Sequence, residues 1–400
     1  MTYRKLKAAY LFDGHKMAQP GAVLICSSEG TIETITDESS AGEGIEQFAG
    51  MLTPGFVNAH CHLELSHLRG LVPEKQGLVS FLLSVITQRN QEQELKDLAA
   101  LAAETEMYAN GIVAVGDICN TPDTLMIKSA GRLNYYNFIE LLGWAPEQAP
   151  ERLKAAATLA EQFKKQSADL LNNDSPRRSF FSISPHAPYS VSRQLWQLME
   201  PGFTGRTVTI HNQESLAENE FFRKGSGDLT RLYSFLKMDI SGFVPPETNS
   251  ISWYLPHLRS AARILLVHNT YMEETDLMQA DAFHEQVFFC FCPNANLYIE
   301  NRLPDIPLFL KHHAKIVLGT DSLASNHQLN ILEEIKTIMR SFAAITTSEI
   351  LSWATFNGAQ ALQLEDRLGD FTQGKKPGIL LIDSIKEGEI TLASTVKRLI

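Results

Sequence analysis

Between residues 55 and about 365, short apolar runs alternate with longer segments that have the spacing of amphipathic helices. A run of strand length followed by a helix, repeated eight times, is the pattern of a (β/α)8 barrel. The eight runs are Phe56-Val57, Ile112–Val115, Tyr135–Ile139, Phe180–Ile183, Val208–Ile210, Ile264–Val267, Val287–Phe291 and Ile316–Leu318. Helices are predicted at Val79–Tyr108, Arg152–Leu171, Gln194–Met199, Ser215–Phe235, Glu273–Phe283, Pro307–His313, Gln328–Arg340 and Ser348–Leu362. We therefore predict an α/β fold, a TIM barrel.

The two ends of the chain have a different pattern. Residues 7–50 contain short strand-like stretches separated by turn-forming residues such as Asp13-Gly14, and Pro377–Asp383 and Glu389–Ser394 repeat this character. Because chain termini often lie close together in space, we predict one small β-sandwich built from both ends. The predicted domains are residues 1–53 plus 366–400 for the sandwich and 54–365 for the catalytic barrel.

Composition narrows the class of partner. Charged residues make up 20% and hydrophobic residues 44% of the 400 residues, as in soluble globular proteins. A net charge of −11 argues against binding nucleic acid or an anionic membrane, so a small-molecule substrate is expected. No stretch approaches the roughly 20 apolar residues that span a bilayer. The five scattered cysteines are expected to be reduced, which predicts a cytoplasmic location: Cys26, Cys61, Cys119, Cys290 and Cys292.

The stretch with the clearest chemical signal is His60-Cys61-His62, which follows the first apolar run. Residues i and i+2 of an extended strand point to the same face, so both imidazoles can approach one ion. Imidazole is a common ligand of zinc and also suits iron. Two unrelated polar residues at the end of a strand would show the same pattern, so the pair needs further ligands.

Further polar residues follow other predicted strands, at the carboxyl ends where barrel enzymes place their catalytic residues. These residues are Asp117, His186, His211, Glu214, His268 and Asp321. Each has an alternative interpretation taken alone. His186 could be a hydrogen-bonded core histidine, Asp321 could cap a turn, and Asp117 could be a capping or supporting carboxylate.

Five ordered motifs resemble those of the amidohydrolase superfamily, in the branch of the cytosine, guanine and S-adenosylhomocysteine deaminases. The similarity covers essentially the whole chain, and the motifs are Pro54-Gly-Phe-Val-Asn-Ala-His-Cys-His62, Pro185-His-Ala-Pro-Tyr-Ser190, His211-Asn-Gln-Glu214, Leu266-Val-His268 and Leu318-Gly-Thr-Asp-Ser-Leu-Ala-Ser-Asn326. The resemblance implies one divalent metal, Zn²⁺ or Fe²⁺, held by His60, His62, His211 and Asp321. No lysine stands at the fourth strand end, so the two-metal members with a carboxylated lysine are not the expected relatives.

The resemblance also implies roles for the remaining residues. Glu214, His268 and Asp321 would be catalytic, because they would carry protons between an attacking water, the substrate ring and the leaving amine. His186 and Ser325 match positions that contact polar substituents of nucleosides. Glu64, two residues beyond His62, is a further candidate for substrate binding.

The implied function is hydrolytic deamination of a 6-aminopurine nucleoside-like substrate with release of ammonia. The motifs favour aminodeoxyfutalosine, a compound of menaquinone biosynthesis. Alternatives are deamination of S-adenosylhomocysteine, methylthioadenosine or guanine, and a triazine-type chlorohydrolase. An inactive barrel that only binds a ligand is the alternative outside enzymes. Analogy with relatives suggests a homodimer.

Overall fold

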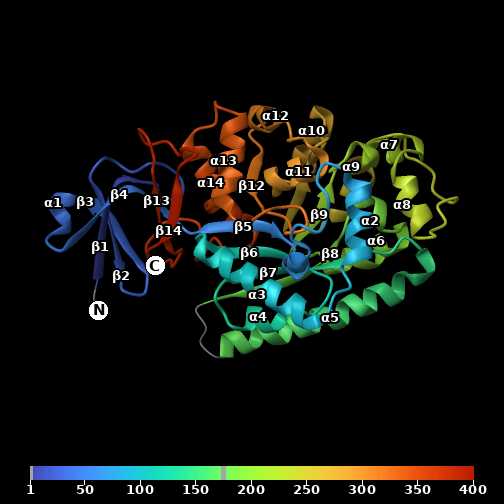
Figure 1. Cartoon of the computed structure of the whole chain (residues 1–400), viewed down its shortest axis with the longest axis horizontal. Helices are drawn as coiled ribbons and strands as arrows, with labels where there is room; N and C mark the ends of the chain where they lie inside the picture. The colour runs from blue at the N-terminus through green and yellow to red at the C-terminus, as the bar shows by residue number, and fades with distance from the viewer. Residues whose placement is uncertain (1–2, 173–176) are drawn as a thin grey trace.

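The computed structural model describes residues 3–172 and 177–400, and eight parallel strands form its centre. Two parallel sheets have the orders β5-β6-β7-β8 and β9-β10-β11-β12 (Figure 1). The strands are β5 (Phe56–Cys61), β6 (Ile112–Cys119), β7 (Asn134–Leu141), β8 (Ser179–Pro185), β9 (Thr207–Asn212), β10 (Arg263–His268), β11 (Val287–Phe291) and β12 (Lys315–Leu318). All eight apolar runs are therefore strands, as predicted.

Hydrogen bonds at both seams close these sheets into one barrel. Between β8 and β9, the His211 amide donates to the His186 carbonyl over 2.9 Å. Between β12 and β5, the Thr320 amide donates to the His60 carbonyl over 3.0 Å, and the Thr320 hydroxyl accepts from the Asn58 amide group over 2.8 Å. The predicted (β/α)8 barrel is confirmed.

The strands are apolar on both faces because each face meets a different layer. In β10, Ile264 and Leu266 belong to the large cluster shared with the surrounding helices. Leu265 and Val267 belong to a second cluster. That cluster joins residues from strands on opposite sides of the barrel, such as Phe138 of β7 and Phe288 of β11, so it fills the interior. Alternation along each strand thus separates barrel interior from helix layer.

Most helices follow the predicted segments, but three segments divide. Ser215–Phe235 splits where Gly225 takes φ 67° and ends α7, since glycine adopts this left-handed conformation without a steric penalty. No helix in the described part of the chain is long and apolar enough to cross a membrane. The principal helices are α2 (Leu78–Gln88), α3 (Gln93–Ala109), α5 (Ala149–Asn172), α6 (Arg193–Met199), α7 (Leu216–Lys224), α8 (Leu229–Phe235), α10 (Glu274–Phe283), α11 (Pro293–Glu300), α12 (Ile306–Lys311), α13 (Ile331–Ser341), α14 (Thr347–Ala354) and α15 (Phe356–Ala361).

Strands from both termini share one six-stranded sheet, so the two ends of the chain form a single β unit. The sheet has the order β14-β13-β4-β1-β2-β3 and lies at one end of the molecule, opposite α2 and α8 (Figure 1). Gly55 alone separates the end of β4 from the start of β5. The strands are β1 (Tyr3–Leu11), β2 (Ala22–Ser27), β3 (Ile32–Asp37), β4 (Ile45–Pro54), β13 (Ile379–Asp383) and β14 (Thr395–Arg398).

Candidate active site

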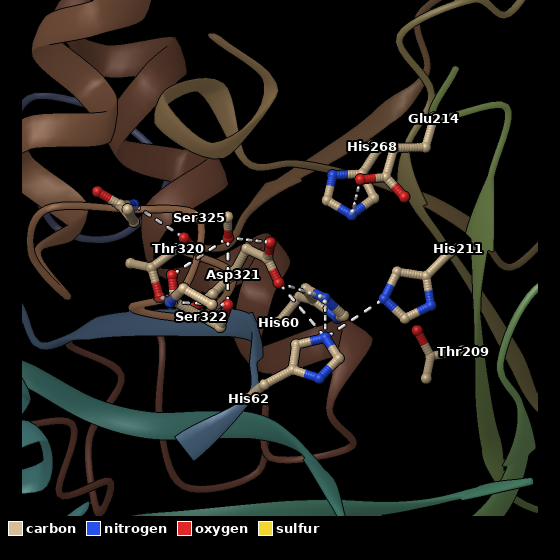
Figure 2. A network of polar contacts seen from close by, with 12 residues as sticks. His60, His62, Thr209, His211, Glu214, His268, Thr320, Asp321, Ser322 and Ser325 are labelled. Atoms are coloured by element: carbon tan, nitrogen blue, oxygen red, sulfur yellow. Dashed lines mark hydrogen bonds and ion pairs between the residues drawn. The ribbon is translucent and has the colours of Figure 1, made fainter. Parts of the chain in front are cut away.

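Four predicted metal ligands converge at the carboxyl ends of the barrel strands. The Nε2 atom of His62 lies 3.2 Å from that of His60 and 3.3 Å from that of His211. Asp321 Oδ1 lies 3.5 Å from His60 Nε2 and 3.4 Å from His62 Nε2. Figure 2 shows these side chains pointing toward one another from β5, β9 and the segment after β12. Residues up to 261 positions apart in the sequence (321 − 60) therefore lie next to one another.

This donor set fits a single divalent ion. Atoms bound about 2.0–2.1 Å from a tetrahedral zinc lie roughly 3.4 Å apart, close to the observed spacing. The His211 Nδ1 atom faces the His186 carbonyl at 2.8 Å, so it holds the ring proton and leaves a lone pair on Nε2. Burial lowers the pKa of His62 and of His211, which keeps both rings in the neutral form that binds metals.

Glu214 and His268 stand on one side of these ligands, as Figure 2 shows. Glu214 Oε1 lies 3.6 Å from His268 Nε2, and both residues line a cavity of about 170 Å³ together with His62, His211 and Asp321. Burial raises the pKa of Glu214 well above its ordinary value and lowers that of His268 to about 3. A protonated carboxyl group and a neutral imidazole can thus face a ligand in this cavity.

Left-handed backbone occurs at three strand ends of the candidate site. Gln213 has φ 44°, His268 φ 72° and Asp321 φ 57°, values that residues other than glycine adopt rarely. The turn before Glu214 is held by Glu218, whose Oε1 accepts from the Gln213 amide over 3.0 Å. Strained backbone persists only where surrounding contacts enforce it, and strained residues cluster at functional sites.

Ser325 contacts a predicted metal ligand. Its hydroxyl donates to Asp321 Oδ2, the side chain is fully buried, and it is not among the residues that line the cavity. Burial raises the pKa of Asp321, but the imidazoles of His60, His62 and His268 together lower it by more, so the carboxylate stays charged. This geometry does not support the predicted substrate contact of Ser325 and instead suggests that Ser325 positions Asp321.

Glu64 and His186 both line the cavity, as their predicted substrate contacts require. Glu64 Oε2 accepts from the amides of Asn120 and Thr121 over 3.0 and 3.1 Å, while burial raises its pKa to about 7. His186 Nδ1 lies 2.7 Å from Ser190 Oγ. These two predicted residues therefore form a polar wall on the β5 to β8 side of the cavity.

Glu140 is a residue of this wall that sequence reasoning missed. It stands in β7, lines the cavity, and accepts from the Asn120 side chain through Oε2 over 2.9 Å. Its Oε1 atom is buried and lacks a hydrogen-bond partner among the described residues. The signal was available, because Glu140 directly follows the third apolar run, Tyr135–Ile139.

Asp117 supports the loop that follows the metal ligands. Its Oδ1 accepts from the Leu63 amide over 2.8 Å, and its Oδ2 lies 2.5 Å from Lys128 Nζ. Both side chains are fully buried. Burial alone lowers the pKa of Lys128, but the adjacent Asp117 carboxylate more than offsets this effect. Of the two roles left open for Asp117, the structure favours that of a supporting carboxylate.

Comparisons with known proteins agree with this geometry. A family model described as the amidohydrolase family matches residues 51–398. An aminodeoxyfutalosine deaminase from Deinococcus radiodurans is 29% identical over 372 residues, which cover 89% of this chain and 85% of that protein. A 5'-deoxyadenosine deaminase from Methanobrevibacter smithii is 24% identical over 395 residues, covering 96% of this chain and 81% of that protein.

A solved structure also shares the fold. The aminofutalosine deaminase of Helicobacter pylori, in complex with methylthio-coformycin, superposes with a TM-score of 0.82 at 22% sequence identity. The match covers 99% of this chain and 100% of that one. The likeness thus includes both the barrel and the sheet built from the two termini, which confirms the predicted fold class.

Proposed function

Because the chain belongs to the amidohydrolase family, we propose that it is a metal-dependent deaminase of a 6-aminopurine nucleoside and releases ammonia. Aminodeoxyfutalosine is the favoured substrate, since a relative that aligns with 89% of this chain carries the name aminodeoxyfutalosine deaminase. This reaction would place the protein in menaquinone biosynthesis.

His60, His62, His211 and Asp321 would hold the metal, Zn²⁺ or Fe²⁺, since imidazole and carboxylate groups bind both ions. A divalent ion bound there supplies an activated water as the nucleophile for a ring carbon. The hydrogen bond from His211 Nδ1 to the His186 carbonyl orients one ligand, and Ser325 orients another.

The protein's own groups move the protons. Burial raises the pKa of Glu214, so its carboxyl group would donate a proton to the ring nitrogen beside the carbon under attack and make that carbon electrophilic. His268 and Asp321 accept and orient the proton lost by the attacking water. His268 and Asp321 then pass this proton to the exocyclic amine, whose bond to the ring carbon breaks as ammonia departs.

The pairing of Glu214 with His268 beside four convergent metal ligands is the observation that carries this proposal. A barrel that only binds a ligand has no need of a buried carboxyl group with a raised pKa within 3.6 Å of the His268 imidazole. The complete set therefore supports catalysis over the binding alternative.

The opposite wall supports a nucleoside over a free base. Glu64, Glu140 and His186 line the cavity together, and carboxylates accept hydrogen bonds from ribose hydroxyls. A base such as guanine offers no hydroxyl groups to this wall. Substrates with a ribose are therefore the expected class, and 5'-deoxyadenosine is the second candidate because another relative is named for its deamination.

The five cysteines are buried and unpaired, which supports a reducing compartment and hence the cytoplasm as the proposed location. Binding of nucleic acid or membranes is not part of the proposal, because the chain carries a net charge of −11. The homodimer expected by analogy stays a prediction.

A substrate panel tests the proposal. The zinc-loaded protein would be assayed with aminodeoxyfutalosine, 5'-deoxyadenosine, methylthioadenosine, S-adenosylhomocysteine, guanine and a chlorotriazine. We expect ammonia release and the accompanying change in purine absorbance with the nucleosides, fastest with aminodeoxyfutalosine. Failure to deaminate any 6-aminopurine would overturn the proposal.

A further inference from the structure

Lys128 is a fully buried cation that the proposed mechanism does not use. It lies on α4 (Leu125–Ser129), a short helix that packs against α3 and α5 (Figure 1). Its side chain has no exposed surface, although lysine is almost never fully buried unless it is paired. The burial of this charge therefore depends on the groups around it.

Three side-chain acceptors surround the ammonium group of Lys128. Its Nζ lies 2.5 Å from Asp117 Oδ2, 2.8 Å from Asn137 Oδ1 and 3.2 Å from Cys119 Sγ. Asn137 is oriented for this contact, because its Nδ2 donates to the Phe180 carbonyl over 2.9 Å and leaves Oδ1 to accept. An ammonium group has three donors and no acceptor, so these three contacts can satisfy all of its protons.

Two aromatic rings complete the surroundings of this cation. Lys128 Nζ lies 5.0 Å from the centroid of the Tyr135 ring and 5.1 Å from that of the Phe163 ring. Attraction between a cation and an aromatic face is stronger where water is excluded. Lys128 is thus a fixed positive charge beside the Asp117 carboxylate.

Asp117 connects Lys128 to the loop that contains a metal ligand. One carboxylate oxygen, Oδ2, faces Lys128, while the other, Oδ1, accepts from the Leu63 amide over 2.8 Å. Leu63 directly follows His62 in the chain. A buried carboxylate without a neighbouring cation is strongly disfavoured, so Lys128 allows Asp117 to present a charged acceptor to this amide.

Pairing between strands does not by itself hold the chain at His62. The register between β5 and β6 shifts between Asn58 and Cys61, and β5 ends at Cys61. Two residues further on, the Leu63 amide donates to the Asp117 side chain and not to a neighbouring strand. This contact therefore fixes the backbone directly after His62.

The His62 ring depends on that backbone more than the His211 ring does on its own. His211 Nδ1 faces the His186 carbonyl at 2.8 Å, which orients the His211 ring directly. In the described parts of the chain, the hydrogen-bond contacts of the His62 ring are those of Nε2 with the other metal ligands. The direction of the His62 ring is therefore set chiefly by its main chain.

We propose that Lys128 is a positioning residue for the metal site: it holds Asp117, which fixes the backbone at Leu63 and so directs His62 toward the ion. This inference rests on the metal site of the proposed function. Lys128 does not line the cavity, so it would contact neither the metal nor the substrate. An ion pair with a purely structural role would stabilise the fold without changing how the ion is bound.

The protein loaded with Co²⁺ tests the proposal, because the visible absorption of this ion reports the geometry of its ligands. We expect Lys128→Met to raise the Kd for Co²⁺ by about tenfold and to change the absorption spectrum, since residues that orient metal ligands contribute about 10- to 100-fold to affinity. Asp117→Asn/Lys128→Met should restore both values toward those of the wild type. This pair of substitutions removes both charges, while an amide oxygen at position 117 can still accept from Leu63.

Lys336→Met is the matched control. Lys336 is also buried, and its Nζ lies 2.7 Å from Glu333 Oε1 on the same helix, α13. Its substitution should leave the Kd and the spectrum unchanged. An unchanged Kd and spectrum in folded Lys128→Met would overturn the inference.

A second double variant covers the case in which Lys128→Met does not fold. Asp117→Leu/Lys128→Met also removes both charges but offers no acceptor to the Leu63 amide. We expect its Kd for Co²⁺ to be about tenfold higher than that of Asp117→Asn/Lys128→Met, and equal values would overturn the inference.

These measurements need no turnover. A wild-type protein that shows the expected Co²⁺ results but deaminates no 6-aminopurine would exclude the proposed reaction and leave the role of Lys128 standing. A wild-type protein that binds no Co²⁺ would overturn both proposals.

Discussion

The two halves of the barrel build their strand ends in different ways. At the ends of β9, β10 and β12, the residues Gln213, His268 and Asp321 have left-handed backbone conformations. At the ends of β5 to β8, none of the described residues other than glycine does so. There, side-chain carboxylates brace the strand ends without such backbone, since Asp117 accepts from the Leu63 amide and Glu64 from the Asn120 amide. In the other half Glu218 likewise accepts from the Gln213 amide, but beside left-handed backbone.

The difference corresponds to two tasks. The half with strained backbone presents Glu214, His268 and Asp321, the groups that would move protons. The half braced by carboxylates presents Glu64 and Glu140, which would bind the substrate. Strained backbone at a few positions would orient the proton-carrying side chains toward one point. Hydrogen bonds to Glu64 and Glu140 would instead hold these acceptors in place. The metal ligands come from both halves, so the ion would join them.

Loss of a metal ligand from either half should have the largest effect. His62→Ala and His211→Ala should each lower bound metal below about half an ion per chain and abolish ammonia release, because the four donors share one ion. Metal analysis and the activity assay measure both outcomes. His284→Ala is the control, because His284 is not among the residues that line the cavity. Full activity in either variant with no bound metal would contradict the assignment.

Substitution in the strained half should affect turnover and not binding. Glu214→Gln should lower kcat by about 10²- to 10⁴-fold, the usual contribution of general acid–base catalysis, with metal content unchanged. Steady-state kinetics and metal analysis test this result. The matched control is Glu220→Gln. Glu220 lies on α7, the helix that follows Glu214 and contains Glu218, but it does not line the cavity. A normal kcat for Glu214→Gln would exclude the proton role.

Substitution in the braced half should affect binding more than turnover. Glu140→Gln should raise KM about tenfold, because a hydrogen bond to a charged group contributes about 1.5–3 kcal/mol. Its kcat and metal content should change little. Glu151→Gln, at an exposed position on α5, is the control. Loss of metal from Glu140→Gln would show instead that Glu140 acts through His211, whose Nδ1 lies 3.7 Å from Glu140 Oε1.

The barrel could be predicted because its strands are buried on both faces and appear as continuous apolar runs. Helix boundaries were harder to predict from the sequence. The predicted helix Val79–Tyr108 is two helices, α2 and α3, and Ser215–Phe235 divides at Gly225. Helical periodicity continues across such breaks, so the sequence pattern alone does not reveal a change in helix direction.

The residues of the candidate site could likewise be predicted only in part. His60, His62, His211 and Asp321 were predicted because each stands shortly after a predicted strand, in motifs that resemble those of the amidohydrolase superfamily. Ser325 was expected at the substrate, yet its hydroxyl contacts Asp321. Which way a side chain points after a strand end depends on local backbone conformation, and no periodicity reports this.

The sequence by itself determined the order of strands and helices and the residues that stand at the strand ends, because burial imposes an apolar pattern and ligands require particular side chains. Only the tertiary structure decided which of these residues share the cavity. It placed Glu140 beside Glu64 and His186 in the cavity wall and turned Ser325 toward Asp321. Contacts between distant segments depend on barrel closure and left-handed turns, which local sequence does not specify.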